Sequence, residues 1–95
     1  MTKYTAGDIA RWNQIAYGNV LNAREFERLC NKFIEGQTFD EYSAFVFRSL
    51  IESSWHYTPE EAAERMEWEE YWLNDYYSRK EPVSSCAAEV GFGCG

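Results

Sequence analysis

Residues 58–80 have the sequence TPEEAAERMEWEEYWLNDYYSRK and carry the strongest helix signals in the chain. Thr58 can cap the first turn, and Glu61, three residues later, completes a capping box. Pro59 takes the first helical position, where its missing N–H is not needed. The stretch ends on an Arg-Lys pair, whose charges suit the negative end of the helix dipole, and Pro82 follows soon after. These signals predict one long helix over residues 58–80.

A continuous helix over this stretch has two unlike faces. At about 100° per residue, one face becomes a stripe of carboxylates and aromatic rings. We expect partner binding by the residues of this stripe: Glu60, Glu64, Glu67, Trp68, Tyr71 and Asp75. The opposite half is apolar and includes Met66 and Leu73, which predicts that it faces the core. Glu69 falls within the apolar half, and we expect either that Arg65, four residues earlier, pairs with it or that this part of the helix faces a partner or the edge of the domain.

Three shorter helices are predicted before residue 58. Each starts at a residue that can cap it and has a carboxylate three residues later: Thr5 with Asp8, Asn22 with Glu25, and Thr38 with Glu41. Apolar residues then recur every three or four positions, which is typical of a side that faces the core. The third helix has the widest apolar arc, so we expect it to be the most buried.

The chain is organised as helices throughout. No stretch alternates β-branched and polar residues as a half-buried strand does. Four helices with short connections predict an all-α domain over residues 1–81, a small four-helix bundle with a long acidic C-terminal helix. Residues 82–95, PVSSCAAEVGFGCG, are small and glycine-rich, so we expect a flexible Gly/Cys tail there.

Composition limits the classes of function. The 95 residues suffice for one domain, and 45% of them are hydrophobic, enough to build a core. The formal net charge of −7 argues against direct binding of nucleic acid, because neutralising phosphates needs an excess of Lys and Arg. It also disfavours anionic membrane surfaces. With no apolar run of about 18 residues and no signal segment, we expect a cytoplasmic protein without membrane association.

Residues that could carry catalysis or hold a metal are few and poorly spaced. The candidate ligands Cys30, His56, Cys86 and Cys94 include no C-x-x-C or H-x-x-x-H pair, so we expect no metal and no cofactor. The serines near His56 do not form a G-x-S-x-G elbow, and the G-x-G at residues 91–93 has no helix after it. We therefore expect a protein that is not an enzyme. Three cysteines, an odd number, fit a reducing compartment.

The stripe of carboxylates and rings is best interpreted as an interface. Like charges one turn apart repel by a few tenths of a kcal/mol per pair, so the stripe weakens its own helix. Negative charge alone would serve solubility, but exposed Trp and Tyr beside carboxylates combine aromatic anchors with electrostatic steering. The predicted partner is a basic protein surface, such as a groove that binds nucleic acid. Carboxylates spaced about 5–6 Å apart approximate the phosphates of a strand.

Small, acidic chains that are rich in helix and aromatic residues and lack catalytic motifs resemble the inhibitors that phages and mobile elements make against host defences. Anti-CRISPR and anti-restriction proteins are among them. Residues 4–12, YTAGDIARW, are similar in style to the starts of some anti-CRISPR proteins, with a capped helix that bears Ile9 and Trp12. The resemblance implies a non-enzymatic inhibitor in the host cytoplasm that occupies a groove of a defence protein. It transfers no site residue to this chain.

Three other interpretations stay open. In a homo-oligomeric adaptor, the acidic stripe of one copy would meet a basic stripe on the second helix of another, formed by Arg24, Arg28 and Lys32. In a precursor peptide, a helical leader would precede a tail modified at Ser84, Ser85, Cys86 and Cys94. A helix-turn-helix regulator fits the short capped helices, but its reading helix would bring Glu towards phosphates.

Overall fold

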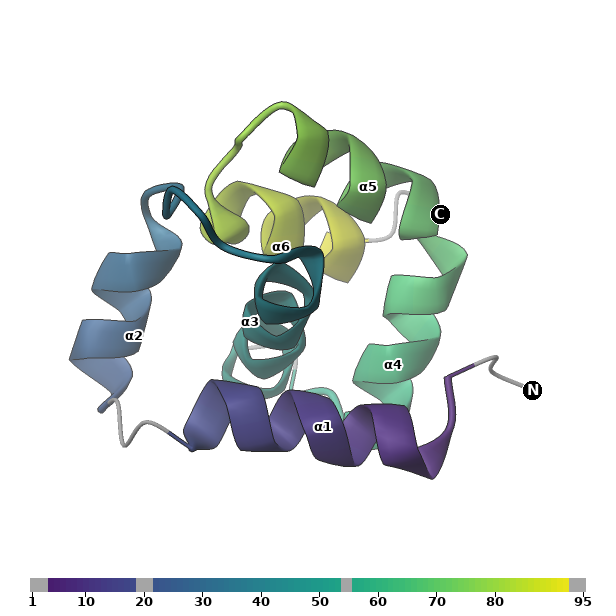
Figure 1. Ribbon diagram of the computed structural model, residues 1–95. Helices are drawn as coiled ribbons and strands as arrows, with labels where there is room; N and C mark the ends of the chain where they lie inside the picture. The colour runs from purple at the N-terminus through teal and green to yellow at the C-terminus, as the bar shows by residue number, and fades with distance from the viewer. Residues whose placement is uncertain (1–3, 19–21, 54–55, 93–95) are drawn as a thin grey trace.

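The computed structural model describes residues 4–18, 22–53 and 56–92, and within these ranges it contains helices and no strand. The helices are α1 (Ala6–Tyr17), α2 (Ala23–Cys30), α3 (Phe39–Glu52), α4 (Pro59–Trp68), α5 (Glu70–Ser78) and α6 (Val83–Phe92). The all-α prediction is confirmed. The predicted four-helix bundle is not: the expected long helix is divided in two, and a further helix follows Pro82 (Figure 1).

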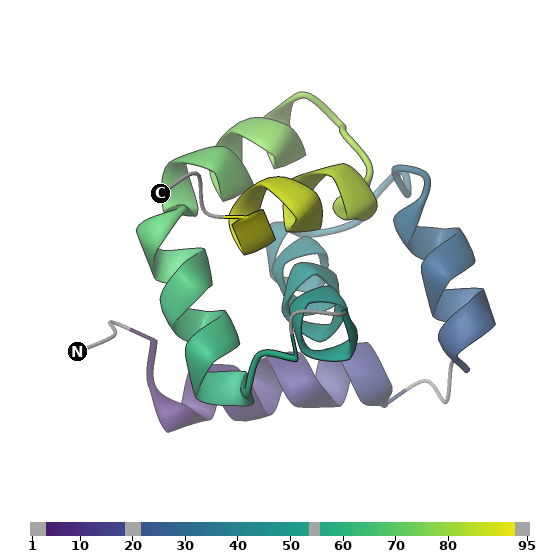
Figure 2. The same cartoon turned by 180° about the vertical axis from the view of Figure 1, so that it is seen from behind.

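The helix α3 lies at the centre of the molecule. Figures 1 and 2 show it almost end-on, with α1 along one side, α2 and α4 on opposite flanks, and α5 and α6 across the remaining side. Residues 42–48 are buried without interruption, and so is Leu50. A helix that is apolar on all sides has to be covered on all sides. The prediction that the third helix is the most buried is confirmed.

The predicted helix starts are also confirmed. Thr5, Thr38 and Thr58 each accept a hydrogen bond from the backbone N–H three residues later, and the carboxylate at that later position accepts one from the N-cap backbone. Asn22 caps α2 in the same way by accepting from the Glu25 N–H at 2.8 Å. These contacts join neighbours in sequence, so they form wherever the helix starts.

The predicted continuous helix over residues 58–80 is wrong at Glu69. This residue ends α4 with φ −106° and ψ 26°, and α5 begins at Glu70 and runs in a new direction (Figure 1). The Glu69 carboxylate pairs with Arg65 at 3.4 Å, as expected from their spacing. This pairing does not need the break, because residues four apart also meet on a continuous helix. The change of direction instead lays α5 against α6 (Figures 1 and 2), where Leu73 is fully buried.

The predicted flexible tail is wrong for residues 83–92, which form α6. Its buried side chains, Val83, Cys86, Ala87 and Val90, recur at the spacing of one helix face. Small residues are what a helix needs to approach α3 closely, so the composition that indicated a mobile tail also suits tight packing. Residues 93–95, and with them Cys94, lie outside the described residues.

Side chains from distant parts of the chain hold both ends of α6. The Tyr42 hydroxyl donates to the Glu81 carbonyl at 2.9 Å, just before the helix begins. At the other end, the Tyr57 hydroxyl donates to the Gly91 carbonyl at 2.8 Å. Carbonyls in the last turn of a helix lack partners within it, so such donors stabilise its end. The α6 helix is therefore anchored by hydrogen bonds as well as by burial.

Arg48 joins three helices inside the fold. It is 3% exposed, and its guanidinium lies 4.5 Å from the Tyr17 ring centroid and 4.2 Å from that of Phe26. It donates to the Ala16 carbonyl at 2.7 Å and to the Glu52 carboxylate at 3.0 Å. The buried charge is thus paired, hydrogen-bonded and stacked, the conditions that make burial of a cation tolerable.

The packing of α6 predicts that Cys86 is protected from thiol reagents. Burial raises the pKa of its thiol from 9.0 to about 12, so the reactive thiolate is scarce at neutral pH. In a Cys94→Ser background, we expect Cys86 to react with a chromogenic disulfide only as fast as the protein unfolds. Deprotonation favours the unfolded chain, so stability should fall as pH rises above about 9.

The matched control for this labelling is Ser85→Cys in the same background, because position 85 is exposed on α6. The thiol introduced there should react at once, while Cys86 stays protected. Equal rates at the two positions, without denaturant, would show that residues 83–92 are a mobile tail.

The position of Arg48 predicts a large loss of stability on its removal. Arg48→Met keeps the apolar stem but leaves the Ala16 carbonyl and Glu52 without their donor. We expect the free energy of unfolding to fall by about 2–3 kcal/mol in urea titrations followed by circular dichroism. Arg28→Met, an exposed arginine on α2, should change it by less than about 0.5 kcal/mol. Equal small effects would contradict the assigned role of Arg48.

Candidate protein-binding surface

The predicted binding residues divide into an exposed group and a half-buried group. Glu60 and Glu64 on α4 are exposed. Trp68, at the end of α4, is 66% exposed, and Tyr71, in the first turn of α5, is 71% exposed. We call these four residues the acidic-aromatic face. Two large aromatic side chains are thus mostly exposed here and are not part of the core, an arrangement that is common at sites of contact.

Glu67 and Asp75, the other two predicted residues, are partly buried and engaged within the molecule. Asp75 pairs with Arg79 at 2.9 Å. Glu67 lies near Tyr4, whose pKa is raised by burial and by the nearby carboxylates of Glu70 and Glu67. Because α5 turns away after Glu69, the six predicted residues do not form one straight row (Figure 1). The regular spacing of carboxylates is confined to α4.

Glu60 and Glu64 keep their charge unneutralised. No ion pair or side-chain hydrogen bond involves either of them within the described part of the chain. The cation on the same helix, Arg65, turns inward instead, donating to the Val90 carbonyl at 3.3 Å and to Glu69 at 3.4 Å. The outer side of α4 therefore presents carboxylates without a compensating charge.

Trp68 packs against Arg65, which is held in place by other contacts. The Arg65 guanidinium lies 5.7 Å from the centroid of its ring. Arg65 is itself mostly buried and is bonded to the end of α6 and to Glu69. Since Arg65 is held in place below the ring, Trp68 and Arg65 lose little conformational freedom when a partner contacts the ring. Such preorganisation favours a strong contribution to binding per unit of area.

A basic stripe lies on the other flank of the molecule. Arg24 and Arg28 on α2, and Lys32 in the turn that follows, are exposed, as the sequence predicts. None of the three forms an ion pair within residues 4–18, 22–53 and 56–92. Figures 1 and 2 show α2 and α4 on opposite flanks, with α3 between them. The exposed carboxylates of Glu25 and Glu27 also lie on α2, so this flank carries charges of both signs with a small excess of cations.

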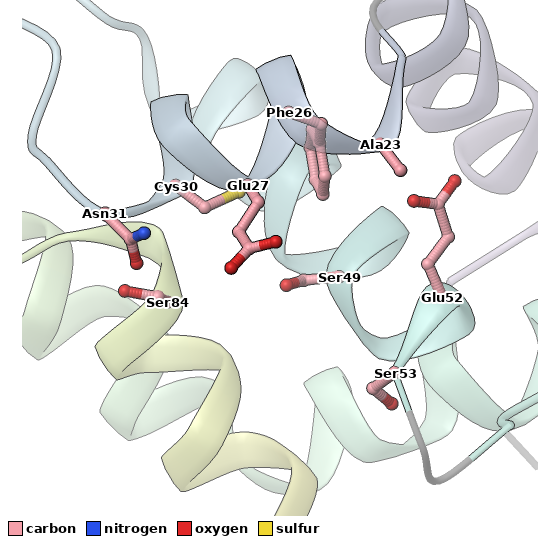
Figure 3. A pocket seen from close by; sticks show the side chains of 9 residues that line it. All are labelled: Ala23, Phe26, Glu27, Cys30, Asn31, Ser49, Glu52, Ser53 and Ser84. Carbon is pink, nitrogen blue, oxygen red and sulfur yellow. The ribbon is translucent and has the colours of Figure 1, made fainter.

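A pocket of about 240 Å³ opens between α2, α3 and α6 (Figure 3). It is lined by Glu27, Cys30, Ser49 and Ser84 among others. Figure 3 shows the carboxylate of Glu52 on its far side, turned towards Ala23, and this carboxylate pairs with Arg48. Sequence reasoning missed the pocket because one wall is α6, where a tail was expected.

The pocket does not present an activated nucleophile. Burial raises the pKa of the Cys30 thiol to about 12, so it is protonated near neutral pH. A nucleophilic cysteine requires a neighbouring base or cation that lowers its pKa, and here the shift has the opposite sign. His56 does not line this pocket and is exposed, with φ 54°. The geometry therefore favours the acidic-aromatic face over this pocket as the functional site.

The described residues contain neither a metal-binding cluster nor a membrane-spanning helix. Among them, no three His, Cys, Asp or Glu side chains gather closely enough to hold a metal ion. None of the described helices combines the length and apolar character needed to cross a membrane.

No family model, curated protein or solved structure matches this chain. The resemblance to small inhibitors of host defence stays a prediction from composition and from the opening residues. The acidic-aromatic face and the basic stripe are the features of the chain itself that bear on function.

Proposed function

We propose that this protein is a non-enzymatic binding protein that docks its acidic-aromatic face onto a basic surface of another protein. One observation carries the proposal: the unpaired carboxylates Glu60 and Glu64 share α4 with the exposed ring of Trp68, and the exposed ring of Tyr71 follows in the first turn of α5. Carboxylates steer a basic partner during approach, and aromatic anchors hold it after contact. Solubility would be served by the carboxylates without the rings.

The chemistry of the face specifies the chemistry of the partner. Arg and Lys side chains satisfy both kinds of group, because they pair with carboxylates and stack on the face of Trp and Tyr rings. Surfaces that concentrate Arg and Lys in a groove are commonly those that bind nucleic acid. The carboxylates of α4 recur about every 6 Å along the helix, close to the repeat of phosphates along a strand.

Occupation of such a groove would inhibit the partner without any chemical step. We accordingly propose an inhibitor of a nucleic-acid-binding defence protein, of the kind that phages and mobile elements direct against CRISPR or restriction systems, acting in the host cytoplasm. The break at Glu69 limits phosphate-like spacing to α4, and the exposed Trp68 and Tyr71 lie on either side of this break. The buried Cys86 gives no support to the alternative of a precursor peptide with a modified tail.

The proposal predicts that reversing charges on α4 abolishes binding. A tagged chain would capture its partner from a host lysate at low salt, and binding to the purified partner would then be titrated. For Glu60→Lys with Glu64→Lys we expect affinity at least tenfold lower, a loss of about 1.4 kcal/mol or more. Trp68→Ala should cost about 2 kcal/mol or more. Wild-type binding should weaken as salt is raised.

The matched control is Glu27→Lys with Glu35→Lys, the same change in net charge on exposed residues away from the acidic-aromatic face. This variant should bind like the wild type, and all variants should keep the wild-type circular dichroism spectrum. Equal loss in the control would show that net charge, not this face, determines binding.

A further inference from the structure

We infer that the molecule associates with itself head to tail, with the basic stripe of one copy seated on the acidic-aromatic face of the next. The two surfaces match in spacing where both are helical, and Lys32 lies beyond this match, in the turn after α2. Arg24, Arg28 and Lys32 follow one another at intervals of four residues, and so do Glu60, Glu64 and Trp68. Four helical residues rise about 6 Å. Each residue of the row on α4 attracts a cation: Glu60 and Glu64 do so through a carboxylate, and Trp68 through the face of its indole ring.

The charged residues of both rows have no ion pair within their own molecule, whereas Trp68 already has the Arg65 guanidinium 5.7 Å from its ring centroid. Of the other exposed cations in the described ranges, Arg11 pairs with Asp8 and Asp40, Arg79 with Asp75, and Lys80 with Glu35. The three cations of the basic stripe form no ion pair, and neither do Glu60 and Glu64. Among the described residues, the exposed Arg and Lys side chains without an ion pair thus lie on α2 and in the turn after it. The carboxylates with neither an ion pair nor a hydrogen bond are Glu60 and Glu64 on α4 and Glu27 on α2.

The position of these helices determines the type of assembly. Because α2 and α4 lie on opposite flanks, the two rows of one molecule cannot meet each other (Figures 1 and 2). A contact between unlike surfaces of two copies is heterologous, so it leaves one free row at each end. The product is an open chain or a ring, and a closed two-fold dimer does not form through these surfaces.

The contact is weak and sensitive to salt. Exposed ion pairs contribute little each and are screened by salt, and the net charge of −7 opposes the approach of two copies. We expect a dissociation constant on the order of 1 mM at low ionic strength. Self-association does not require the partner proposed above. It does use the same acidic-aromatic face, so a partner docked there would compete with it.

Translational diffusion measured by NMR, from micromolar to millimolar protein at low ionic strength, tests the inference. Diffusion of the wild type should slow progressively with concentration and recover when salt is added. Two neutralised variants, Arg24→Gln with Arg28→Gln and Glu60→Gln with Glu64→Gln, should each remain monomeric alone. The second variant lowers the net negative charge, so an effect of net charge alone would increase its association instead.

Mixing the variants tests the head-to-tail geometry. An equimolar mixture retains one intact pair of surfaces, so it should form heterodimers that do not grow further. A chain carrying Arg24→Glu and Arg28→Glu together with Glu60→Lys and Glu64→Lys should regain self-association, because both rows are reversed. The inference is overturned if the wild type stays monomeric at millimolar concentration, if it stops at a dimer that excludes the variants, or if either neutralised variant associates like the wild type.

The outcome is separable from the proposed function. The variant with Arg24→Gln and Arg28→Gln keeps its acidic-aromatic face, so it should capture the partner as the wild type does. Loss of self-association with retained capture supports both proposals, and a monomeric wild type that captures the partner overturns self-association alone.

Discussion

The structure depends on the need to cover α3. Residues 42–48 of this helix are buried on every side, so the rest of the chain has to shield its apolar surface from water on all sides. The other helices are placed as that requirement dictates: α1 and α4 flank α3, and α6 closes the last side. The α2 helix adds the ring of Phe26, whose centroid lies 5.6 Å from that of Phe45. Tyr42 and Phe47 are fully buried as a result.

The many tyrosines are explained by the way the helix ends are held. Tyr42, Tyr57 and Tyr77 each place a ring in or against the core and donate through the hydroxyl to a backbone carbonyl far away in sequence. A tyrosine combines apolar area with a polar tip, so one residue serves both needs. Arg48 and Arg65 act similarly on carbonyls at the ends of α1 and α6. Within the described part of the chain, most aromatic residues are therefore committed to the fold, and Trp68 and Tyr71 are the most exposed of them.

Local features could be predicted from the sequence because they depend on neighbours in the chain. The caps at Thr5, Thr38 and Thr58 and the pairing of Arg65 with Glu69 are of this kind. The exposure of Glu60, Glu64, Trp68 and Tyr71 followed from the helical period alone. The break at Glu69 could not be predicted in this way, because it depends on where Leu73 has to be buried. The partial burial of Glu67 and Asp75 depends equally on contacts outside the helix period.

The α6 helix was missed although its pattern was present. Val83, Cys86, Ala87 and Val90 have helical spacing, but small residues and nearby glycines carry a weak signal until α3 is known to need a cover. The order of the elements has a consequence for biosynthesis. During translation α3 is made before α4, α5 and α6, so its apolar surface stays partly uncovered until residues near 92 have been added. Chaperones that bind exposed apolar segments would meet this chain in that interval, and a truncation before α6 would prolong it indefinitely.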